Sequence, residues 1–272
     1  MKNIYPNIYA ANFINLKKAK KIIENNNVIG LPTETVYGLA ANAYSDIAVK
    51  KIFKLKSRPS YNPLIIHFKN LDSLKKNVIL NNYFLKLYRK FCPGPITFIL
   101  NKKAKSKISI FATSRKKTVA VRIPKHKVAR KLLKTLNVPL AAPSANISSK
   151  LSPTSPYDVV DEFKNKIKFI LDGKKSKIGL ESTIIDLTAN PKILRPGSIT
   201  AEKISKILKR KIKIIKKIKT VKSPGQLKSH YSPGIPVKIN SKASEKNDAV
   251  VGFGKNFKSR RNHFNLSKNG NL

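Results

Sequence analysis

The sequence predicts an α/β protein whose helices pack against an open, twisted, mixed sheet. Segments with apolar residues at helical spacing alternate along the chain with short apolar runs of strand type, which is the pattern of α/β folds. Several connections between the apolar runs are too short to hold a crossover helix, which favours some antiparallel neighbours in the sheet. Apolar residues make up 41% of the 272 residues, enough to build one large core.

The first part of the chain supplies two helices and two strands. Residues 14–26, INLKKAKKIIENN, have the spacing of an amphipathic helix, and the strand after them breaks at Pro32 into a threonine-rich turn. Asp46 is a candidate N-cap for a second helix, which would bring Lys56 to its C-terminal end. The run PLIIHF, residues 63–68, has the length and composition of a short buried strand.

Helices and strands keep alternating further along. A helix that carries Phe84 and Leu87 on one face ends before Pro93. Another helix should begin at Ser155, which Asp158 follows at the spacing of a capped start. A helix is also predicted over residues 128–136, and strands over residues 96–100, 118–124, 139–144, 169–171, 182–187 and 192–197.

Changes in composition divide the chain into three predicted regions. Residues 1–201 form the main domain, which we expect to be catalytic. Residues 202–237 form a basic segment, in which isoleucine and lysine alternate as on a solvated surface, and a linker rich in proline and glycine. Residues 238–272 offer one strand and then polar sequence that cannot bury enough apolar surface to offset its ordering entropy. We expect this last region to be an incomplete small α/β domain, loosely attached.

The chain is strongly basic, with 57 Lys and Arg against 13 Asp and Glu and a formal charge of +44. An excess of Lys, Ile and Asn together is typical of compositional drift, but such a field still attracts polyanions such as RNA. The single cysteine, Cys92, excludes an intrachain disulfide and a cysteine-based zinc site, and it suits a reducing compartment. No apolar run reaches the length of a membrane span, so we expect a cytoplasmic protein.

A first candidate site surrounds the strand PLIIHF. Lys56 and Arg58 precede this strand, Asn62 stands at its start and His67 lies near its end. Phosphate recognition needs a bidentate arginine, a lysine point charge and an amide at the edge of a sheet, where strand ends leave a crevice. The alternative is that these residues are solvent-facing charges beside a core strand.

Other segments also place polar groups at strand ends. Ser144 and Asn146 follow an apolar strand in a proline-flanked loop that lets backbone N–H groups approach a ligand, although ordinary loops have similar composition. Arg122 interrupts an apolar strand, and a buried guanidinium needs either an anion or a structural ion-pair partner. Ser182 and Arg195 stand at two further strand ends.

Eight segments follow one another in a recognisable order. They are LPTETVYGL, KSRPSYNPLIIHF, CPGPITFIL, VAVRIP, SANISSKLSPT, ESTIIDL, LRPGSI and SPGQLKSHYSP, and they fall within residues 17–237. In this order they resemble the YrdC-like L-threonylcarbamoyladenylate synthases, and the last segment resembles the linker of the longer, two-domain form. The resemblance implies a YrdC-like open twisted mixed sheet with helices and a basic concave groove.

The resemblance also implies an activity. Enzymes of this family are nucleotidyltransferases that join L-threonine, bicarbonate and ATP into threonylcarbamoyl-AMP and pyrophosphate. The product would supply a downstream threonylcarbamoyl transferase that modifies a tRNA adenosine beside the anticodon, and direct RNA binding would be weak. This chemistry needs no nucleophilic side chain, so catalysis should consist of positioning and charge stabilisation. Mg²⁺ should arrive with ATP, because the sequence shows no acidic cage for a metal.

Roles for individual residues follow from the resemblance. Catalytic roles fall to Lys56, Arg58, Ser144 and Asn146, with Lys56 and Asn146 helping to hold phosphates. The implied threonine-binding residues are Thr35, His67, Arg122, Ala142 and Ser182, with Arg122 as the partner of the substrate carboxylate. The implied ATP-binding residues are Arg58, Asn62, Thr118, Ser144, Ser152, Arg195 and Tyr231. Tyr231 belongs to the linker, which would fold over the nucleotide as a lid and exclude water.

Three positions depart from the family pattern. Ser57 and Ser149 stand where glycine is usual, and Cys92 stands where an aromatic residue is common. A glycine lost at a position of positive φ costs about 1 kcal/mol, so the loops at both serines should be slightly altered. None of the three departures removes a group assigned to the chemistry.

Two other functions stay open. A non-catalytic module that binds tRNA or double-stranded RNA would suit the charge, but RNA platforms need aromatic residues among the basic ones, and residues 203–222 contain none. A relative that processes carbamoyl phosphate, such as the YrdC-like domain of hydrogenase maturation proteins, would carry zinc-finger and acylphosphatase segments that are absent from this sequence.

Overall fold

The computed structural model describes most of the chain. The described residues are 5–215, 221–225, 235–239, 241, 244–245, 247–255 and 262–270. The chain divides into two compact units, Met1–Pro233 and Gly234–Leu272, and each is described by itself.

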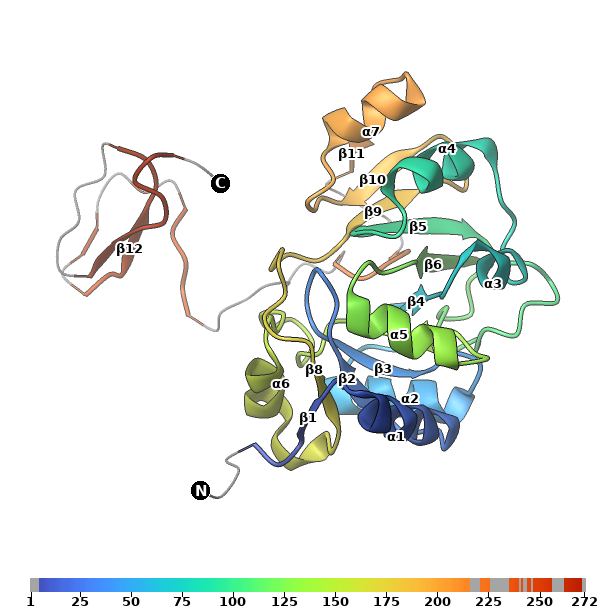
Figure 1. Cartoon of the computed structure of the whole chain (residues 1–272). Coiled ribbons are helices and arrows are strands. Elements are labelled where there is room, and N and C mark those ends of the chain that lie inside the picture. The colour runs from blue at the N-terminus through green and yellow to red at the C-terminus, as the bar shows by residue number, and fades with distance from the viewer. Residues whose placement is uncertain are drawn as a thin grey trace. The chain divides into compact units, whose positions relative to one another are not determined.

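The first unit contains most of the helices and strands (Figure 1). The helices are α1 (Phe13–Glu24), α2 (Asp46–Lys56), α3 (Leu71–Lys75), α4 (Asn82–Phe91), α5 (Lys127–Thr135), α6 (Pro156–Phe163) and α7 (Ala201–Leu208), with a short 3-10 turn, η1 (Lys164–Lys166). The strands are β1 (Ile8–Ala10), β2 (Ile29–Leu31), β3 (Gly38–Asn42), β4 (Ile65–His67), β5 (Ile96–Asn101), β6 (Thr118–Arg122), β7 (Leu140–Ala141), β8 (Ile170–Asp172), β9 (Thr183–Asp186), β10 (Lys192–Arg195) and β11 (Lys213–Ile214).

The described strands of this unit form one 11-stranded sheet in the order β1-β8-β2-β3-β7-β4-β6-β5-β9-β10-β11. Pairs such as β4 with β6 and β5 with β9 are parallel, whereas β2 with β3 and β5 with β6 are antiparallel. The predicted mixed α/β fold is therefore confirmed. Its largest core cluster joins apolar side chains of α2, α4 and α7 to the strands at the centre of the sheet, and a second cluster holds α1 and α5.

Helix starts follow local capping chemistry. At α6 the predicted capped start is confirmed, because the Ser155 hydroxyl accepts a bond from the Asp158 N–H and the Asp158 carboxylate bonds back to the Ser155 N–H. The predicted N-cap of α2 is wrong by one residue. Ser45 is the N-cap, and its hydroxyl accepts a hydrogen bond from the Ala48 N–H at 3.2 Å. Asp46 is the first helical residue, where its negative charge interacts favourably with the helix dipole.

The segment after residue 201 has the solvated basic face that the sequence predicts, and it also buries an apolar side. Ile204 and Leu208 of α7 and Ile212 beyond it are buried in the largest core cluster, and β11 pairs in parallel with β10. In α7 the spacing of apolar and lysine residues reflects one buried and one exposed side, whereas both residues of β11 are exposed. The packed body continues past the domain boundary predicted at residue 201.

The second unit holds two short strands, β12 (Val250–Gly252) and β13 (His263–Asn265). They pair in parallel, with Val251 opposite Phe264. The prediction of a single strand here missed β13, because three residues flanked by polar sequence carry no periodic signal.

The two serines that replace family glycines both have positive φ. Ser57, the C-cap of α2, has φ 48° and ψ 41°, and Ser149 has φ 77°. Both lie in the left-handed region, where a side chain is disfavoured and glycine is not. The structure thus gives a physical reason for glycine at both positions.

We expect Ser57→Gly to stabilise the protein. Relief of left-handed strain outweighs the added freedom of the unfolded chain, so the free energy of unfolding should rise by about 0.5–1 kcal/mol. Urea unfolding measures this change. The control is Ser60→Gly, an exposed serine three positions on whose φ is not positive, which should bring no gain. A loss of stability in Ser57→Gly would contradict the prediction.

Candidate functional site

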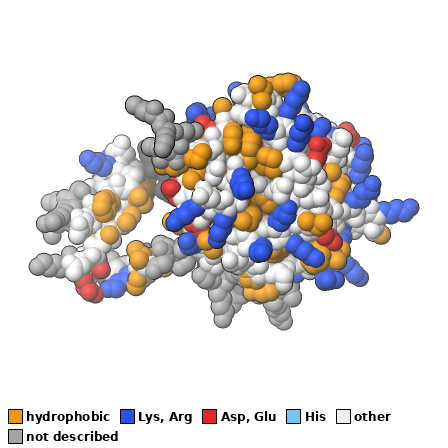
Figure 2. Space-filling view, turned by 90° about the horizontal axis from the view of Figure 1, so that it is seen from below, with side chains coloured by type: hydrophobic (Ala, Val, Ile, Leu, Met, Phe, Trp, Pro, Cys, Tyr) orange, Lys and Arg blue, Asp and Glu red, His pale blue; other side chains and the backbone are white. Residues whose placement is uncertain are grey.

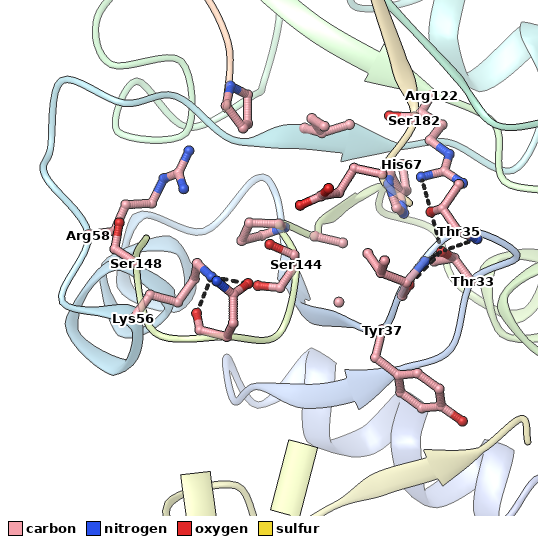
Figure 3. A pocket seen from close by; sticks show the side chains of 18 of the residues that line it. Thr33, Thr35, Tyr37, Lys56, Arg58, His67, Arg122, Ser144, Ser148 and Ser182 are labelled. Atoms are coloured by element: carbon pink, nitrogen blue, oxygen red, sulfur yellow. Dashed lines mark hydrogen bonds between the residues drawn. The ribbon is translucent and has the colours of Figure 1, made fainter. Parts of the chain in front are cut away.

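A pocket opens where several strand ends and loops of the first unit meet. Eleven of the residues predicted for the site line it (Figure 3). They are Thr35, Lys56, Arg58, Asn62, His67, Arg122, Ala142, Ser144, Asn146, Ser182 and Arg195. The structure therefore brings together groups that are spread over 161 positions of sequence, from residue 35 to residue 195.

The pocket has two chemically different ends. In Figure 3, Lys56 and Arg58 lie on one side, Arg122, His67 and Ser182 lie on the other, and Ser144 lies between them. The first side takes its cations from the C-terminal end of α2, and the second takes its polar groups from the adjacent strands β4 and β6.

Arg122 is buried and held from three directions. Its Nη2 donates to Glu34 Oε1 at 2.7 Å, its Nη1 donates to Thr35 Oγ1 at 3.0 Å, and its Nε donates to the Gly94 carbonyl at 3.3 Å. The ion pair with Glu34 is the structural alternative that the sequence left open. A pair of this kind permits a guanidinium inside an apolar sheet, and it does not exclude a ligand, because an arginine has five N–H donors.

The threonine turn between β2 and β3 forms a directed hydrogen-bond chain. Thr33 Oγ1 donates its single proton to the Val36 carbonyl at 2.6 Å, so the 2.8 Å bond between the two hydroxyls must be donated by Thr35. Arg122 in turn donates to Thr35. The Thr35 hydroxyl thus has no proton left for a ligand and can only accept from one.

His67 lies beside Arg122 in the sheet, in register on β4 and β6. The ring is buried, and its Nδ1 has no hydrogen-bond partner among the described residues. Burial and the charge of Arg122 lower the pKa of His67 to about 3, despite the opposing effect of Glu34. The imidazole is therefore neutral at physiological pH and offers the pocket a polar group without a charge.

This buried histidine should make stability depend on pH. Its folded pKa lies below the ordinary 6.5, so the unfolded chain takes up the proton more readily. The stabilising contribution is complete above pH 6.5 and is lost as the pH falls from 6.5 towards 3. Urea unfolding at about pH 7, 6 and 5 should show that the wild type loses up to about 2 kcal/mol more than His67→Gln over this range. Parallel pH profiles for the two proteins would contradict the assignment.

Two further arginines, Arg58 and Arg195, line the pocket. Arg58 donates to the Asn62 and Pro63 carbonyls and to Asn62 Oδ1, all within 3 Å. Arg195 donates to the Ser182 carbonyl and hydroxyl at 3.0 to 3.2 Å. Burial and the nearby Arg195 lower the pKa of Arg58 to about 9, so the guanidinium stays charged at neutral pH. Two pocket-lining guanidinium groups whose charges interact favour binding of a polyanion.

Lys56 holds the loop after β7. Its Nζ is buried and donates to the Ser144 carbonyl at 2.6 Å and to the Asn146 carbonyl. Burial and the charge of Arg58 hold the pKa of Lys56 well below its usual value. Two of the Lys56 donors therefore fix the loop that carries Ser144. This structural role stands beside the predicted role of Lys56 as a point charge for phosphate, which stays a prediction.

Asn146 turns an acceptor towards the pocket. Its Nδ2 donates to the Ile147 and Lys150 carbonyls, each at 2.8 Å, which fixes the orientation of the amide. Its Oδ1 is buried and has no partner among the described residues. An oxygen in this position can approach phosphates only through a cation, a water or another donor.

Two predicted ATP-binding residues, Thr118 and Ser152, are not among the described residues that line the pocket. Thr118 stands at the opposite end of β6 from Arg122, in register with Asn101. Ser152 donates to Oε1 of Glu181 at 2.5 Å, and Glu181 lines the pocket. Tyr231 lies outside the described residues.

The described start of the linker reaches the pocket. Lys222 pairs with the buried Asp186 of β9 at 3.0 Å, and Pro224 lines the pocket. Gly225 has φ +84°, and a Cβ on it would lie 2.6 Å from Cδ of Arg195. This close approach requires glycine. The lid itself stays a prediction.

Sequence reasoning missed two acids of the site, Glu34 and Glu181. Both are buried, and Glu181 lines the pocket. A signal was available, since the chain has only 13 acids and each of these two stands next to a residue predicted to bind threonine, Thr35 or Ser182. In a chain with so few acids, an acid next to a predicted site residue is a candidate counter-ion for a cation of the site.

Among the described residues no group of three or more His, Cys, Asp or Glu side chains is placed to hold a metal ion. Within the same part of the chain, every helix is too short or too polar to cross a membrane. Figure 2 shows Lys and Arg side chains spread over the face it displays, with few acids among them, as expected from the overall composition.

The chain matches two family models. The Sua5/YciO/YrdC model, described as telomere recombination, matches residues 21–197, and a model described as the C-terminal domain of threonylcarbamoyl-AMP synthase matches residues 199–269. The threonylcarbamoyl-AMP synthase of Pyrococcus abyssi is 43% identical over 231 residues, which cover 82% of this chain. The threonylcarbamoyl-AMP synthase of Bacillus subtilis is 39% identical over 230 residues, again 82% of this chain.

Both alignments cover 66% of the relative, so the chain spans slightly less than two thirds of their length. A solved structure of Pyrococcus abyssi Sua5 complexed with L-threonine superposes with a TM-score of 0.79 at 38% identity. That superposition covers 91% of this chain and 70% of the solved one.

Proposed function

Since this chain belongs to the Sua5/YciO/YrdC family, we propose that it makes threonylcarbamoyl-AMP and pyrophosphate from L-threonine, bicarbonate and ATP. One observation carries the proposal: a single pocket is lined by Arg122, anchored in a charge-balanced pair with Glu34, and by two further arginines, Arg58 and Arg195. The first arrangement suits one carboxylate, and the second suits a polyphosphate.

The chemistry proceeds in two steps. The free amine of threonine attacks carbon dioxide from bicarbonate, an N–C bond forms and the nitrogen loses a proton, which gives a carbamate. A carbamate oxygen then attacks the α-phosphorus of ATP, the bond to the bridging oxygen of the β-phosphate breaks, and pyrophosphate leaves. Neither step uses a side chain as nucleophile, so the protein contributes orientation and charge stabilisation.

We assign the carboxylate of threonine to Arg122 and the phosphates to Arg58 and Arg195. Thr35, His67, Ala142 and Ser182 would surround threonine, with Thr35 accepting from a donor of the ligand. Ser144, Asn62, Lys56 and Asn146 would lie along the nucleotide. Thr118 and Ser152, which do not line the pocket, stay proposed ATP contacts, and so does Tyr231, which lies outside the described residues. A lid that includes Tyr231 would exclude water from the labile carbamate and mixed anhydride.

Mg²⁺ is proposed to enter with ATP. This ion usually keeps several waters and binds through the substrate phosphates and one or two oxygens of the protein. Asn146 Oδ1, buried without a partner among the described residues, and the Glu181 carboxylate are oxygens that the pocket would offer it. When bound, the ion would neutralise charge on the phosphates as pyrophosphate leaves.

The product is an activated mixed anhydride, so a downstream threonylcarbamoyl transferase must consume it, and we propose that the final acceptor is a tRNA adenosine beside the anticodon. We also propose that the protein acts in the cytoplasm, because ATP and tRNA are both present there. The charge of +44 would support weak RNA binding beside this activity.

The test is pyrophosphate release from ATP with substrates omitted one at a time. Release should require both L-threonine and bicarbonate, and carbamoyl phosphate should not replace the pair. Release that carbamoyl phosphate supports would identify a carbamoyl-phosphate-processing enzyme instead. Tight tRNA binding without any threonine-dependent release would favour the non-catalytic RNA-binding module.

A further inference from the structure

The turn that carries Glu34 is fixed by a second loop. The carbonyl oxygens of three successive residues, 33 to 35, each accept a bond from the loop at residues 176–179. The three donors are Ser176 Oγ, Ile178 N and Gly179 N, each at 3.0 Å. The backbone of the turn is therefore held without any help from the Glu34 side chain.

Both oxygens of the Glu34 carboxylate accept hydrogen bonds from the protein. Oε1 accepts from Arg122 at 2.7 Å, and Oε2 accepts from the backbone N–H groups of Lys125 and His126 at 3.0 and 3.2 Å. Burial alone would raise the pKa of Glu34, but the charge and the hydrogen bond of Arg122 outweigh it and hold the pKa below its ordinary value. The group is a fixed carboxylate, and each of its oxygens already accepts from the protein.

The same contacts define what Arg122 can still do. Its bonds to Glu34, Thr35 and Gly94 use three of the five N–H donors of a guanidinium. The other two have no partner among the described residues, and Arg122 lines the pocket. One bond on each nitrogen fixes the plane of the group, because rotation would break all three bonds together.

We propose that Glu34 is a positioning residue for the carboxylate subsite: it fixes and charge-balances the Arg122 guanidinium so that its two uncommitted N–H groups meet a ligand carboxylate. The proposal rests on the function proposed above and assigns Glu34 no contact with substrate. Glu34 thereby sets the preference of the pocket for an amino acid over the corresponding amide, since only a carboxylate accepts both N–H groups as an anion.

Glu34→Gln tests the charge with little change of shape. The new amide must direct its NH₂ group either at Arg122 or at the two backbone N–H groups, so a donor faces a donor in both orientations. Arg122 then loses its charged partner in both orientations, and in one of them it also loses the hydrogen bond. The KM for L-threonine should rise about tenfold or more, while the KM for ATP stays within about twofold. The preference for L-threonine over L-threoninamide in kcat/KM should fall by a similar factor.

The matched control is Glu24→Gln, the same change at an exposed acid of α1 that pairs with Lys20. It should alter neither substrate's KM. Glu34→Asp, which keeps the charge and shortens the reach, is measured beside Glu34→Gln and should also raise the threonine KM selectively. ATP affinity is checked by calorimetry in each variant as a readout of an intact pocket.

The outcomes separate the two proposals. If the wild type releases no pyrophosphate with threonine and bicarbonate, the proposed function fails whatever Glu34 does. If the wild type is active, an unchanged threonine KM or unchanged selectivity in either folded Glu34 variant overturns the positioning role. Joint loss of threonine and ATP binding in both variants also overturns it, because Glu34 would then serve the fold and not the subsite.

Discussion

Arg122→Ala is expected to abolish use of threonine while the nucleotide end of the pocket survives. The substitution removes the two uncommitted donors that we assign to the substrate carboxylate, and a charge-assisted contact of this kind contributes about 1.5–3 kcal/mol or more. Threonine affinity should therefore fall by more than about tenfold. Calorimetry with threonine and with ATP measures the two effects separately.

The same substitution leaves Glu34 buried without its cation, so the folded protein should also lose stability. Breaking a buried pair in this way costs about 3–5 kcal/mol, and a second variant is needed to separate folding from binding. Arg122→Ala combined with Glu34→Ala removes both charges and should recover part of the stability without recovering threonine affinity. Unchanged threonine affinity in the single variant would contradict the assignment.

Arg58→Ala is expected to act on the other ligand. Arg58 and Arg195 both line the pocket and their charges interact, and loss of the Arg58 guanidinium should weaken ATP binding by about tenfold or more. Threonine affinity should change by no more than about twofold, because Arg122 and its partners lie at the far end of the pocket in Figure 3.

Lys54→Ala is the matched control for Arg58→Ala. Lys54 lies on the same helix, α2, carries the same charge and is exposed, so ATP affinity should hardly change when it is removed. Equal losses of both ligands in Arg58→Ala would indicate a folding defect, since Arg58 also bonds the loop at Asn62. Equal losses of ATP in the two variants would mean that overall charge, and not the pocket, binds the nucleotide.

Local features of the fold were predictable from the sequence where periodicity and capping are strong. The helix that ends at Lys56, the break at Pro32 and the capped start at Ser155 all rest on interactions within a few residues. The order of the strands was not predictable in this way. Ile8 of β1 pairs with Ile170 of β8, and no local pattern specifies a partner 162 residues away.

The candidate site shows the same limit. Its cations could be listed from their positions at strand ends, and Arg122 could be recognised as costly to bury. The group that balances it could not be identified, because Glu34 comes 88 residues earlier in a turn, and only the tertiary fold brings the two within 2.7 Å. The direction of the Thr35 hydroxyl and the orientation of Asn146 likewise depend on neighbours that the sequence does not place.

Formation of the product from labelled bicarbonate tests the central claim most directly. The full chain is incubated with L-threonine, ATP, Mg²⁺ and ¹³C-bicarbonate, and the nucleotide products are analysed by mass spectrometry. The account predicts a threonylcarbamoyl-AMP ion whose mass increases by the single labelled carbon and which is absent when threonine is omitted. AMP and pyrophosphate formed without any labelled adduct, or formed equally without threonine, would contradict it.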